Sequence, residues 1–443
     1  MERHLSLTFS RVATAAAAAV AIALVSLAAR APAAAQTQPQ EIKVGIVAFL
    51  SGAAASPFGI PARNGAEILL EGLDKGSVPA PYEKKGFGGI KIVPVYMDEA
   101  AGPDPITAYR RLASSVDFVI GYISSEHCLS IAPAAEQQQK LTVFFDCGTP
   151  RIFEDNSYNY VFRTTATAAV DNIAAARYVF SLYPNIKTVS GINQNYAWGQ
   201  DSWKEFSAAI TSLDSKVKIG SAQFPAIFAG SYSSQISALL SADPDVIHSS
   251  FWGGDAEGLL IQGAPLGLFT RSHVVLTAGE PILHRQGIAS LMPSGVVLGA
   301  RGPHGPLAPE SKLDDWFSRT YEDRYNNTPA YPSYHMAQAI LGLKAAFEKA
   351  QTVNHTEHPT NAQIISAFEH LSFTTPSGTI TMALGKGHQA VEPAAYGVTK
   401  VENGKVTLVD VKHYPVECVN PPAGMKADQW IAQHFPGAKN CPK

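Results

Sequence analysis

Five short apolar segments of this chain are each followed by small, hydroxyl-bearing or aromatic side chains that suit the binding of a small molecule. These groups occupy residues 121–125, 146–149, 193–198, 251–254 and 278–280. If the apolar segments are strands of open α/β sheets, the groups lie at the carboxyl ends of those strands, where such sheets bind ligands. Backbone N–H groups and hydroxyls at helix starts suit a carboxylate, and aromatic rings enclose an apolar body. Aromatic residues can also simply pack loops, but five such groups favour a binding site.

Catalytic signatures are missing from the sequence. There is no G-x-S-x-G elbow, no H-E-x-x-H pair, no Walker loop and no G-x-G-x-x-G after a strand, and the 13 histidines lack zinc-site spacing. A dispersed Ser/His/Asp triad stays open, as does a carboxylate pair assembled from Glu126, Asp146 and Glu280. We therefore predict a binding protein and not an enzyme, with no cofactor and no metal.

Residues 1–36 have the pattern of a secretory signal peptide. Arg3 and Arg11 give a positive start, residues 12–29 are mostly apolar, and small side chains lead up to Ala35 and Gln36. A membrane anchor is the alternative, because about 18 apolar residues is near the minimum for spanning a bilayer. The Ala-rich run and the small-residue tail favour cleavage near Ala35/Gln36, so we predict a periplasmic protein.

Composition sets further limits. The mature chain of about 400 residues is long enough for two domains. A net charge of -3 without basic clusters gives no electrostatic footprint for nucleic acid. In an oxidising compartment the four cysteines allow three pairings, of which we favour Cys418–Cys441 and Cys128–Cys147. The alternative that Cys128 and Cys147 are buried free thiols stays open.

Apolar, β-rich segments alternate with helical stretches, which predicts parallel sheets with crossover helices. In a first set we expect strands at 42–49, 90–97, 116–121 and 141–145, with helices over 64–73, 105–114 and from about 126. A second set has strands at 188–192, 217–224, 246–249 and 274–276, with helices over 167–182, 200–213 and 232–240. Helices over 312–325, 334–350 and 361–371 follow, then antiparallel strands at 396–400 and 405–411. The fold class predicted is therefore α/β, with two doubly wound domains.

The ordered segments resemble the periplasmic branched-chain amino-acid-binding proteins, the substrate-binding subunits of ABC importers. Residues 42–47 (IKVGIV), with Ser51-Gly52 and Asn64, look like the first strand, loop and helix of that family. Residues 160–164 (YVFRT) look like its first interdomain crossing, and residues 196–200 (YAWGQ) are similar to the segment where the family reads Y-G-x-G/D. The likeness runs in order from about residue 41 to about 410.

The resemblance implies two α/β lobes joined by three crossing strands, with a ligand cleft between them. Applied to this sequence, the resemblance implies that lobe 1 holds residues 37–161 plus 302–375 and that lobe 2 holds residues 162–301 plus 376–443. The implied function is a monomeric solute-binding protein that closes over its ligand and delivers it to an ABC permease in the inner membrane, with no nucleic-acid partner. The alternatives are a secreted hydrolase that uses cleft carboxylates and a ligand-sensing periplasmic domain for a sensor kinase.

The resemblance also assigns site residues in the first lobe. The family's carboxylate-gripping loop matches Ser125, and Gly148 and Thr149 follow the next strand. The aromatic residue of the family's first loop matches Phe58.

In the second lobe, the matching positions are Trp198 and Trp252 as aromatic walls and Glu280 as the partner of a ligand ammonium. Two bulky Trp side chains favour a flat or aromatic ligand, so an amino acid, an aromatic acid and an amide all stay open. Glu126 and Asp146 depart from the expected pattern. Either acid would repel an anionic ligand if it faced the cleft, although it could instead face solvent or cap a helix.

Overall fold

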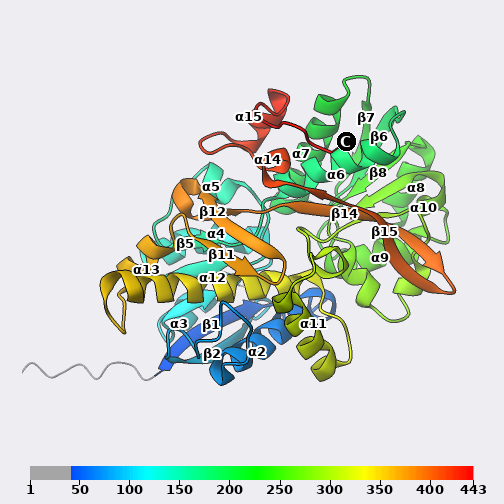
Figure 1. Cartoon of the computed structure of the whole chain (residues 1–443). Coiled ribbons are helices and arrows are strands. Elements are labelled where there is room, and N and C mark those ends of the chain that lie inside the picture. Colours follow the sequence, from blue (N-terminus) through cyan, green and yellow to red (C-terminus); the bar gives the residue numbers. More distant parts are fainter. Residues whose placement is uncertain (1–40, 103, 443) are drawn as a thin grey trace, which may run out of the picture. The chain divides into compact units, whose positions relative to one another are not determined.

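The structure is a computed structural model that describes residues 41–102 and 104–442, and its strands form two separate sheets (Figure 1). The strand order is β11-β12-β13-β5-β4-β3-β1-β2 in the first sheet and β15-β14-β10-β9-β8-β6-β7 in the second. The predicted signal peptide and its cleavage site lie outside the described residues. Among the residues that are described, no helix combines the length and the apolar character needed to cross a bilayer.

The first sheet is parallel through β2, β1, β3, β4 and β5, and an antiparallel hairpin extends it. Its strands are β1 (Glu41–Ala48), β2 (Lys91–Asp98), β3 (Phe118–Ile120), β4 (Thr142–Phe144), β5 (Val161–Arg163), β11 (Ser372–Thr375), β12 (Gly378–Leu384) and β13 (Gln389–Val391). The helices of this half are α2 (Ile60–Lys75), α3 (Pro105–Ala113), α4 (Ser125–Gln137), α5 (Arg151–Glu154), α11 (Lys312–Tyr325), α12 (Tyr331–Asn354) and α13 (Asn361–Phe368).

Helices cover both faces of this sheet because its strands are apolar on both sides. Val44 and Ile46 pack into one core, which also holds Leu69 of α2 and Ile340 of α12. The next side chain along, Val47, enters a separate core with residues of α3 and α4. This period of two, with both faces buried, is the pattern of a doubly wound sheet.

The second sheet repeats this arrangement. Its strands are β6 (Thr188–Ile192), β7 (Lys218–Gln223), β8 (Val246–Ser249), β9 (His273–Leu276), β10 (Val297–Gly299), β14 (Ala394–Glu402) and β15 (Lys405–Tyr414). Helices α6 (Ala168–Leu182) and α7 (Ala197–Leu213) contribute to one core, and α8 (Ser233–Ala242), α9 (Gly253–Gly263) and α10 (Leu268–Arg271) to the other. The C-terminal segment adds α14 (Val416–Val419) and α15 (Ala427–Ala432), which join the first of these cores. Short helical turns complete the described elements: η1 (Ala55–Gly59), η2 (Glu280–His284), η3 (Ala289–Leu291), η4 (Gly305–Leu307) and η5 (Gly385–Gly387).

The chain crosses between the two halves three times: from β5 to α6, from β10 toward α11, and from β13 to β14. This is the two-lobe arrangement expected from the resemblance. One predicted lobe boundary needs revision, because β12 and β13 follow residue 375 and yet pair within the first sheet. The reason is a tight hairpin between Thr375 and Gly378, whose φ of 109° suits glycine, so the chain turns back onto β11 before it crosses. The other predicted boundaries stay a prediction.

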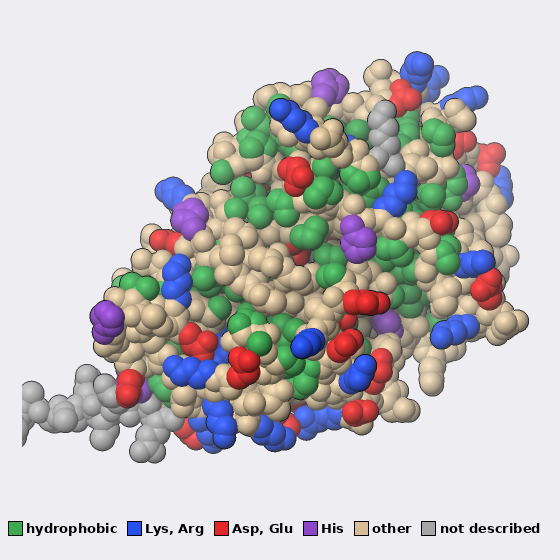
Figure 2. Space-filling view, viewed as in Figure 1, with side chains coloured by type: hydrophobic (Ala, Val, Ile, Leu, Met, Phe, Trp, Pro, Cys, Tyr) green, Lys and Arg blue, Asp and Glu red, His purple; other side chains and the backbone are tan. Residues whose placement is uncertain are grey.

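Both predicted disulfides are present. Cys128–Cys147 joins α4 to the loop after β4, and Cys418–Cys441 closes the C-terminal segment. The alternative of free thiols at Cys128 and Cys147 is therefore wrong. On the face shown in Figure 2, acidic and basic side chains are interspersed, without a broad area of one sign.

Candidate functional site

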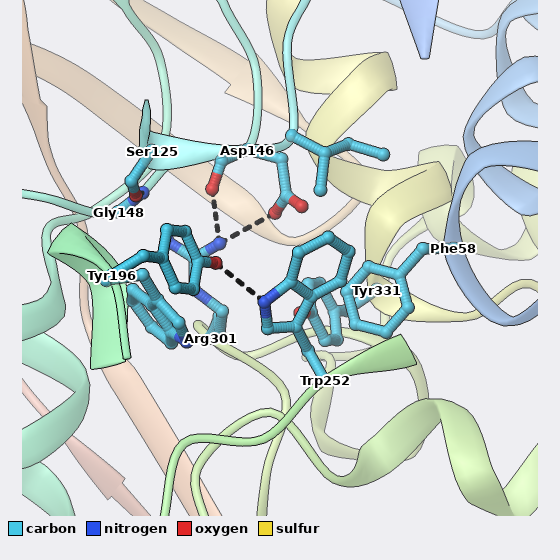
Figure 3. Close-up of a pocket in the computed structure, with 10 residues that line it drawn as sticks. Phe58, Ser125, Asp146, Gly148, Tyr196, Trp252, Arg301 and Tyr331 are labelled. Carbon is cyan, nitrogen blue, oxygen red and sulfur yellow. Dashed lines mark hydrogen bonds and ion pairs between the residues drawn. The ribbon is translucent and has the colours of Figure 1, made fainter. Parts of the chain in front are cut away.

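A small cavity lies between the two lobes, and it gathers residues from both (Figure 3). Ser125, Trp198 and Trp252 lie at the starts of α4, α7 and α9, each of which follows a strand. The partial positive charge at these helix starts favours an anionic ligand group. The residues that line the cavity are Phe58, Ile123, Ser125, Asp146, Gly148, Tyr196, Trp198, Trp252, Arg301 and Tyr331.

Ser125 is positioned to donate a hydrogen bond into this cavity. Its Oγ accepts the backbone N–H groups of Gly148 and Thr149, both at 3.2 Å. Because the oxygen acts as acceptor in both bonds and no other described residue accepts its hydrogen, the hydroxyl remains able to donate to a ligand. The Cys128–Cys147 disulfide holds the two segments that carry these groups together.

Gly148 provides the space in which three groups meet. A Cβ at this position would lie 2.3 Å from the Trp198 ring and 2.7 Å from Nη2 of Arg301. Any side chain here would therefore push the second lobe and the guanidinium away. The glycine is required for close approach of the lobes and not for an unusual backbone angle.

Arg301 lies on the second crossing and ties both lobes together. Its Nη1 donates to the Asp146 carboxylate at 2.8 Å and to the Asp146 carbonyl (Figure 3). Its Nε donates to Asp171 at 3.2 Å. The guanidinium carbon also lies 4.6 Å from the centre of the Trp198 ring, a cation–π contact. Nη2 is buried and has no hydrogen-bond acceptor among the described residues. A ligand oxygen in the cavity would supply the acceptor that this donor lacks.

Burial and the neighbouring charges together determine the pKa values of Arg301 and Asp171. Burial alone would lower the pKa of Arg301, but the Asp146 and Asp171 carboxylates outweigh it and raise that pKa, so the guanidinium stays charged. Burial raises the pKa of Asp171 to about 7, against the opposing attraction of Arg301. Near neutral pH, Asp171 therefore exchanges a proton easily, and a second anion beside Arg301 would favour its protonated form.

Aromatic rings form the other walls. Trp252 of the second lobe lies 5.1 Å from Phe58 and 5.9 Å from Phe49 of the first lobe, centre to centre. Its Nε1 donates to the Tyr196 hydroxyl at 2.7 Å, and Tyr331 meets Phe58 edge to face at 5.3 Å. These walls suit a flat apolar body better than a small aliphatic one.

The lobes touch directly in this structure, and the cavity is correspondingly tight. Thr149 and Arg151 of the first lobe donate to Asp201 of the second at 2.7 and 2.9 Å, and Gly254 N–H donates to the Ala53 carbonyl at 3.1 Å. The cavity volume is about 10 Å³, which is roughly what one water molecule needs. An aromatic acid therefore enters only when side chains move or the lobes separate.

A buried polar network joins the three crossings behind the cavity. His335 of α12 bonds Asp146 at 2.6 Å, the Arg301 carbonyl at 3.0 Å and the Thr165 hydroxyl at 3.1 Å. Glu392 on the third crossing accepts the Ala166 N–H at 2.6 Å, and burial raises the pKa of Glu392 to about 8. These hydrogen bonds link residues of the three crossings to one another.

The structure brings five of the seven predicted site residues to the cavity. They are Phe58, Ser125, Gly148, Trp198 and Trp252.

Thr149 and Glu280 do not line the cavity. The Thr149 hydroxyl is engaged with Asp201 across the interlobe contact. Glu280 is fully buried in η2, where one oxygen bonds His284 at 2.5 Å and the other accepts the Tyr331 N–H at 3.0 Å. Glu280 is thus engaged with η2 and the start of α12 and lies outside the lining of the cavity, and its assignment to a ligand ammonium stays a prediction.

The open question about the two acids has a different answer for each. Glu126 is exposed in the first turn of α4, where the partial positive charge of the helix start stabilises its negative charge. Asp146 lines the cavity, but Arg301 and His335 bond its carboxylate. Its negative charge is therefore compensated and does not exclude an anionic ligand.

Arg301 and Tyr331 are the main cavity residues that the sequence analysis missed. Arg301 follows the short strand β10, which was not among the predicted strands, so its place at a strand end went unrecognised. Tyr331 precedes a proline at the start of α12, and nothing local marks it as a cavity residue.

A family model described as periplasmic binding protein matches residues 41–405, most of the chain. The protein belongs to the periplasmic binding protein family. Membership confirms the resemblance and the two-lobe fold, and it assigns the protein to an extracytoplasmic family of transport-binding proteins. A comparison with curated proteins finds no match.

Solved structures with the same fold include ABC transporter solute-binding proteins. One from Rhodopseudomonas palustris BisB5, in complex with 3,4-dihydroxybenzoic acid, has 20% identity and a TM-score of 0.71, covering 85% of this chain and 98% of that one. A second from R. palustris, in complex with benzoate, has 19% identity and a TM-score of 0.68 over 84% and 96% of the two chains. The leucine-binding protein LivK from Thermotoga maritima has 19% identity and a TM-score of 0.68 over 84% and 98%. At these identities the likeness is one of fold.

Proposed function

We propose that this protein is the solute-binding component of an ABC importer and that its ligand is a small aromatic carboxylate. The observation that supports the ligand class most directly is Nη2 of Arg301, a buried cationic donor without an acceptor at the cavity wall. The Ser125 hydroxyl supplies a second donor, and Trp198 and Trp252 supply flat walls. A carboxylate on an aromatic ring satisfies both donors and fills the apolar part.

Binding would proceed by closure of the lobes around the ligand. Ser125 and Phe58 come from the first lobe, Trp198 and Trp252 from the second, and Arg301 from a crossing. Because the open form makes only part of these contacts, the ligand has a higher affinity for the closed form and shifts the population toward it. The closed form would then be the one that a permease recognises.

Similar structures support the aromatic class, since two R. palustris proteins of this fold are described in complex with benzoates. An amino acid is the second candidate, supported by the likeness to LivK. Its ammonium group would need an acidic partner, and Asp146 is the one acid that lines the described cavity. Since Arg301 and His335 already engage Asp146, the aromatic carboxylate is the better fit.

The remaining features follow from this role. Residues 1–36 would direct export, with cleavage near Ala35/Gln36, and the mature protein would act as a monomer beside an inner-membrane permease. A hydrolase would convert the bound ligand, and a sensor domain would require a kinase in place of the permease.

A ligand screen tests the proposal. Purified mature protein is heated with benzoate, 4-hydroxybenzoate, benzamide, leucine or phenethylamine, and hits are titrated by calorimetry. We expect a benzoate to raise the thermal midpoint, because a ligand that binds only the folded state stabilises it. The ligand should be recovered unchanged after incubation. Stabilisation by the amine or by leucine alone would contradict the carboxylate assignment, and a converted ligand would contradict the binding role.

A further inference from the structure

A second and larger cavity lies on a different part of the molecule, between the first lobe and the C-terminal segment. Its volume is about 560 Å³, against about 10 Å³ for the interlobe cavity. The two cavities share no lining residue. Its walls come from α5, from the end of β12 with η5, and from residues 421–426. Figure 1 shows α5 and β12 close to the segment that carries α14 and α15. We call this space the tail cavity; its size falls within the range of small-molecule sites.

Arg163, at the end of β5, forms part of the wall and carries an unused donor. Its side chain is 0% exposed; Nε donates to Gln389 at 2.6 Å, and Nη1 donates to the carbonyls of Cys147 and Thr149 at 3.0 and 2.6 Å. Nη2 has no acceptor among the described residues. A buried donor of this kind is costly unless a partner supplies the missing hydrogen bond.

Arg163 also forms no direct ion pair with a described residue, although the carboxylates of Glu154 and Glu205 attract its charge from farther away. No carboxylate of the described residues lies within ion-pair distance of it, and burial, assisted by repulsion from Arg301, lowers the pKa of Arg163 to about 9. Glu154 lines the same cavity; burial raises the pKa of Glu154, and its Oε1 accepts the Ala427 N–H at 3.0 Å. That hydrogen bond engages the acid with the C-terminal segment, whereas Nη2 of Arg163 has no acceptor among the described residues.

The rest of the tail cavity is cationic at its rim and apolar on its walls. Lys386 is exposed on η5 and has no partner among the described residues, whereas Lys426 is paired with Asp155 at 2.7 Å. Phe153 of α5 lies beside the Arg163 guanidinium, with its ring centre 5.7 Å away, and Met425 faces the cavity from the tail.

We propose that the tail cavity is a second binding site, which takes a small carboxylate with an apolar body. The carboxylate would accept a hydrogen bond from Nη2 of Arg163 and be attracted by the positive charge of Lys386. The apolar part of the ligand would pack against Phe153 and Met425. This site shares no lining residue with the interlobe cavity, and the proposal does not rest on the ligand class proposed for that cavity.

Octanoate is the probe, and octanamide is its uncharged control. We expect calorimetry on the mature protein to show octanoate binding, with octanamide at least about tenfold weaker, because the amide lacks the charge. Trp252→Ala, which alters only the interlobe cavity, should leave octanoate affinity unchanged. Ala383→Trp, on the wall of the tail cavity, should abolish it by filling the space.

A charge reversal makes the test independent of any packing defect in the filled variant. Lys386→Glu should weaken octanoate binding about tenfold, whereas the matched reversal Lys405→Glu, at an exposed position on β15, should not. Thermal midpoints establish that each variant is folded. The proposal is overturned if octanoate does not bind, if binding survives both Ala383→Trp and Lys386→Glu, or if Trp252→Ala abolishes it.

Discussion

Trp252 of the second lobe packs against aromatic rings of the first lobe at the cavity wall, and its replacement by alanine should raise the Kd of the ligand. The ring lies 5.1 Å from Phe58, 5.5 Å from Phe228 and 5.9 Å from Phe49, and its Nε1 bonds the Tyr196 hydroxyl. Loss of one aromatic wall against a flat ligand costs about 1–3 kcal/mol, which corresponds to about a five- to 150-fold rise in Kd. Trp252→Ala should therefore fall in this range, and Trp252→Phe, which keeps a ring, should weaken binding less.

Calorimetry with the tightest aromatic carboxylate measures this effect. Trp316→Ala is the matched control, because it removes a Trp that packs on Gly72, outside the interlobe cavity. Both alanine variants lose stability, by up to about 3–5 kcal/mol, so titrations are run well below each thermal midpoint. An unchanged Kd in Trp252→Ala, or an equal loss in Trp316→Ala, would refute the role of this wall.

Three further changes test the charges and the tail. Arg301→Lys keeps a charge but loses the planar fork, so affinity for an aromatic carboxylate should fall by about tenfold or more in calorimetry; unchanged affinity would contradict the assignment. Asp171, with its pKa raised by burial to about 7, should be protonated when an anion binds beside Arg301. Affinity should therefore fall about tenfold from pH 6 to pH 8 and lose that dependence in Asp171→Asn; a profile shared by both proteins would argue against the coupling. The double change Cys418→Ser and Cys441→Ser removes a cross-link over 23 residues and should lower the free energy of unfolding by about 3 kcal/mol in urea without altering ligand affinity; equal stability would show that the tail packs as well without it.

Much of the fold was predictable because its strands are short apolar runs. The predicted strand at 188–192 coincides with β6, and the one at 42–49 overlaps β1 almost completely. The hairpin strands β12 and β13 were missed, and β13 (Gln389–Val391) has too few residues to show a period of two. Their pairing moved the third crossing to a later point than predicted.

The site was partly predictable for a similar reason. Ser125, Trp198 and Trp252 follow apolar runs, and strand order brings such positions to one cleft. Glu280 follows a run too, but whether its oxygens face the cleft depends on His284 and on the start of α12, which are tertiary contacts. Sequence position alone does not reveal where such a carboxylate points.

A crystal structure with the tightest aromatic carboxylate would show whether that acid lies between the lobes with its carboxylate on Arg301. We expect one carboxylate oxygen at hydrogen-bond distance from Nη2 of Arg301, a second contact to the Ser125 hydroxyl, and the ring between Trp198 and Trp252. A ligand outside this cleft, or one bound there with its carboxylate turned away from Arg301, would contradict the account.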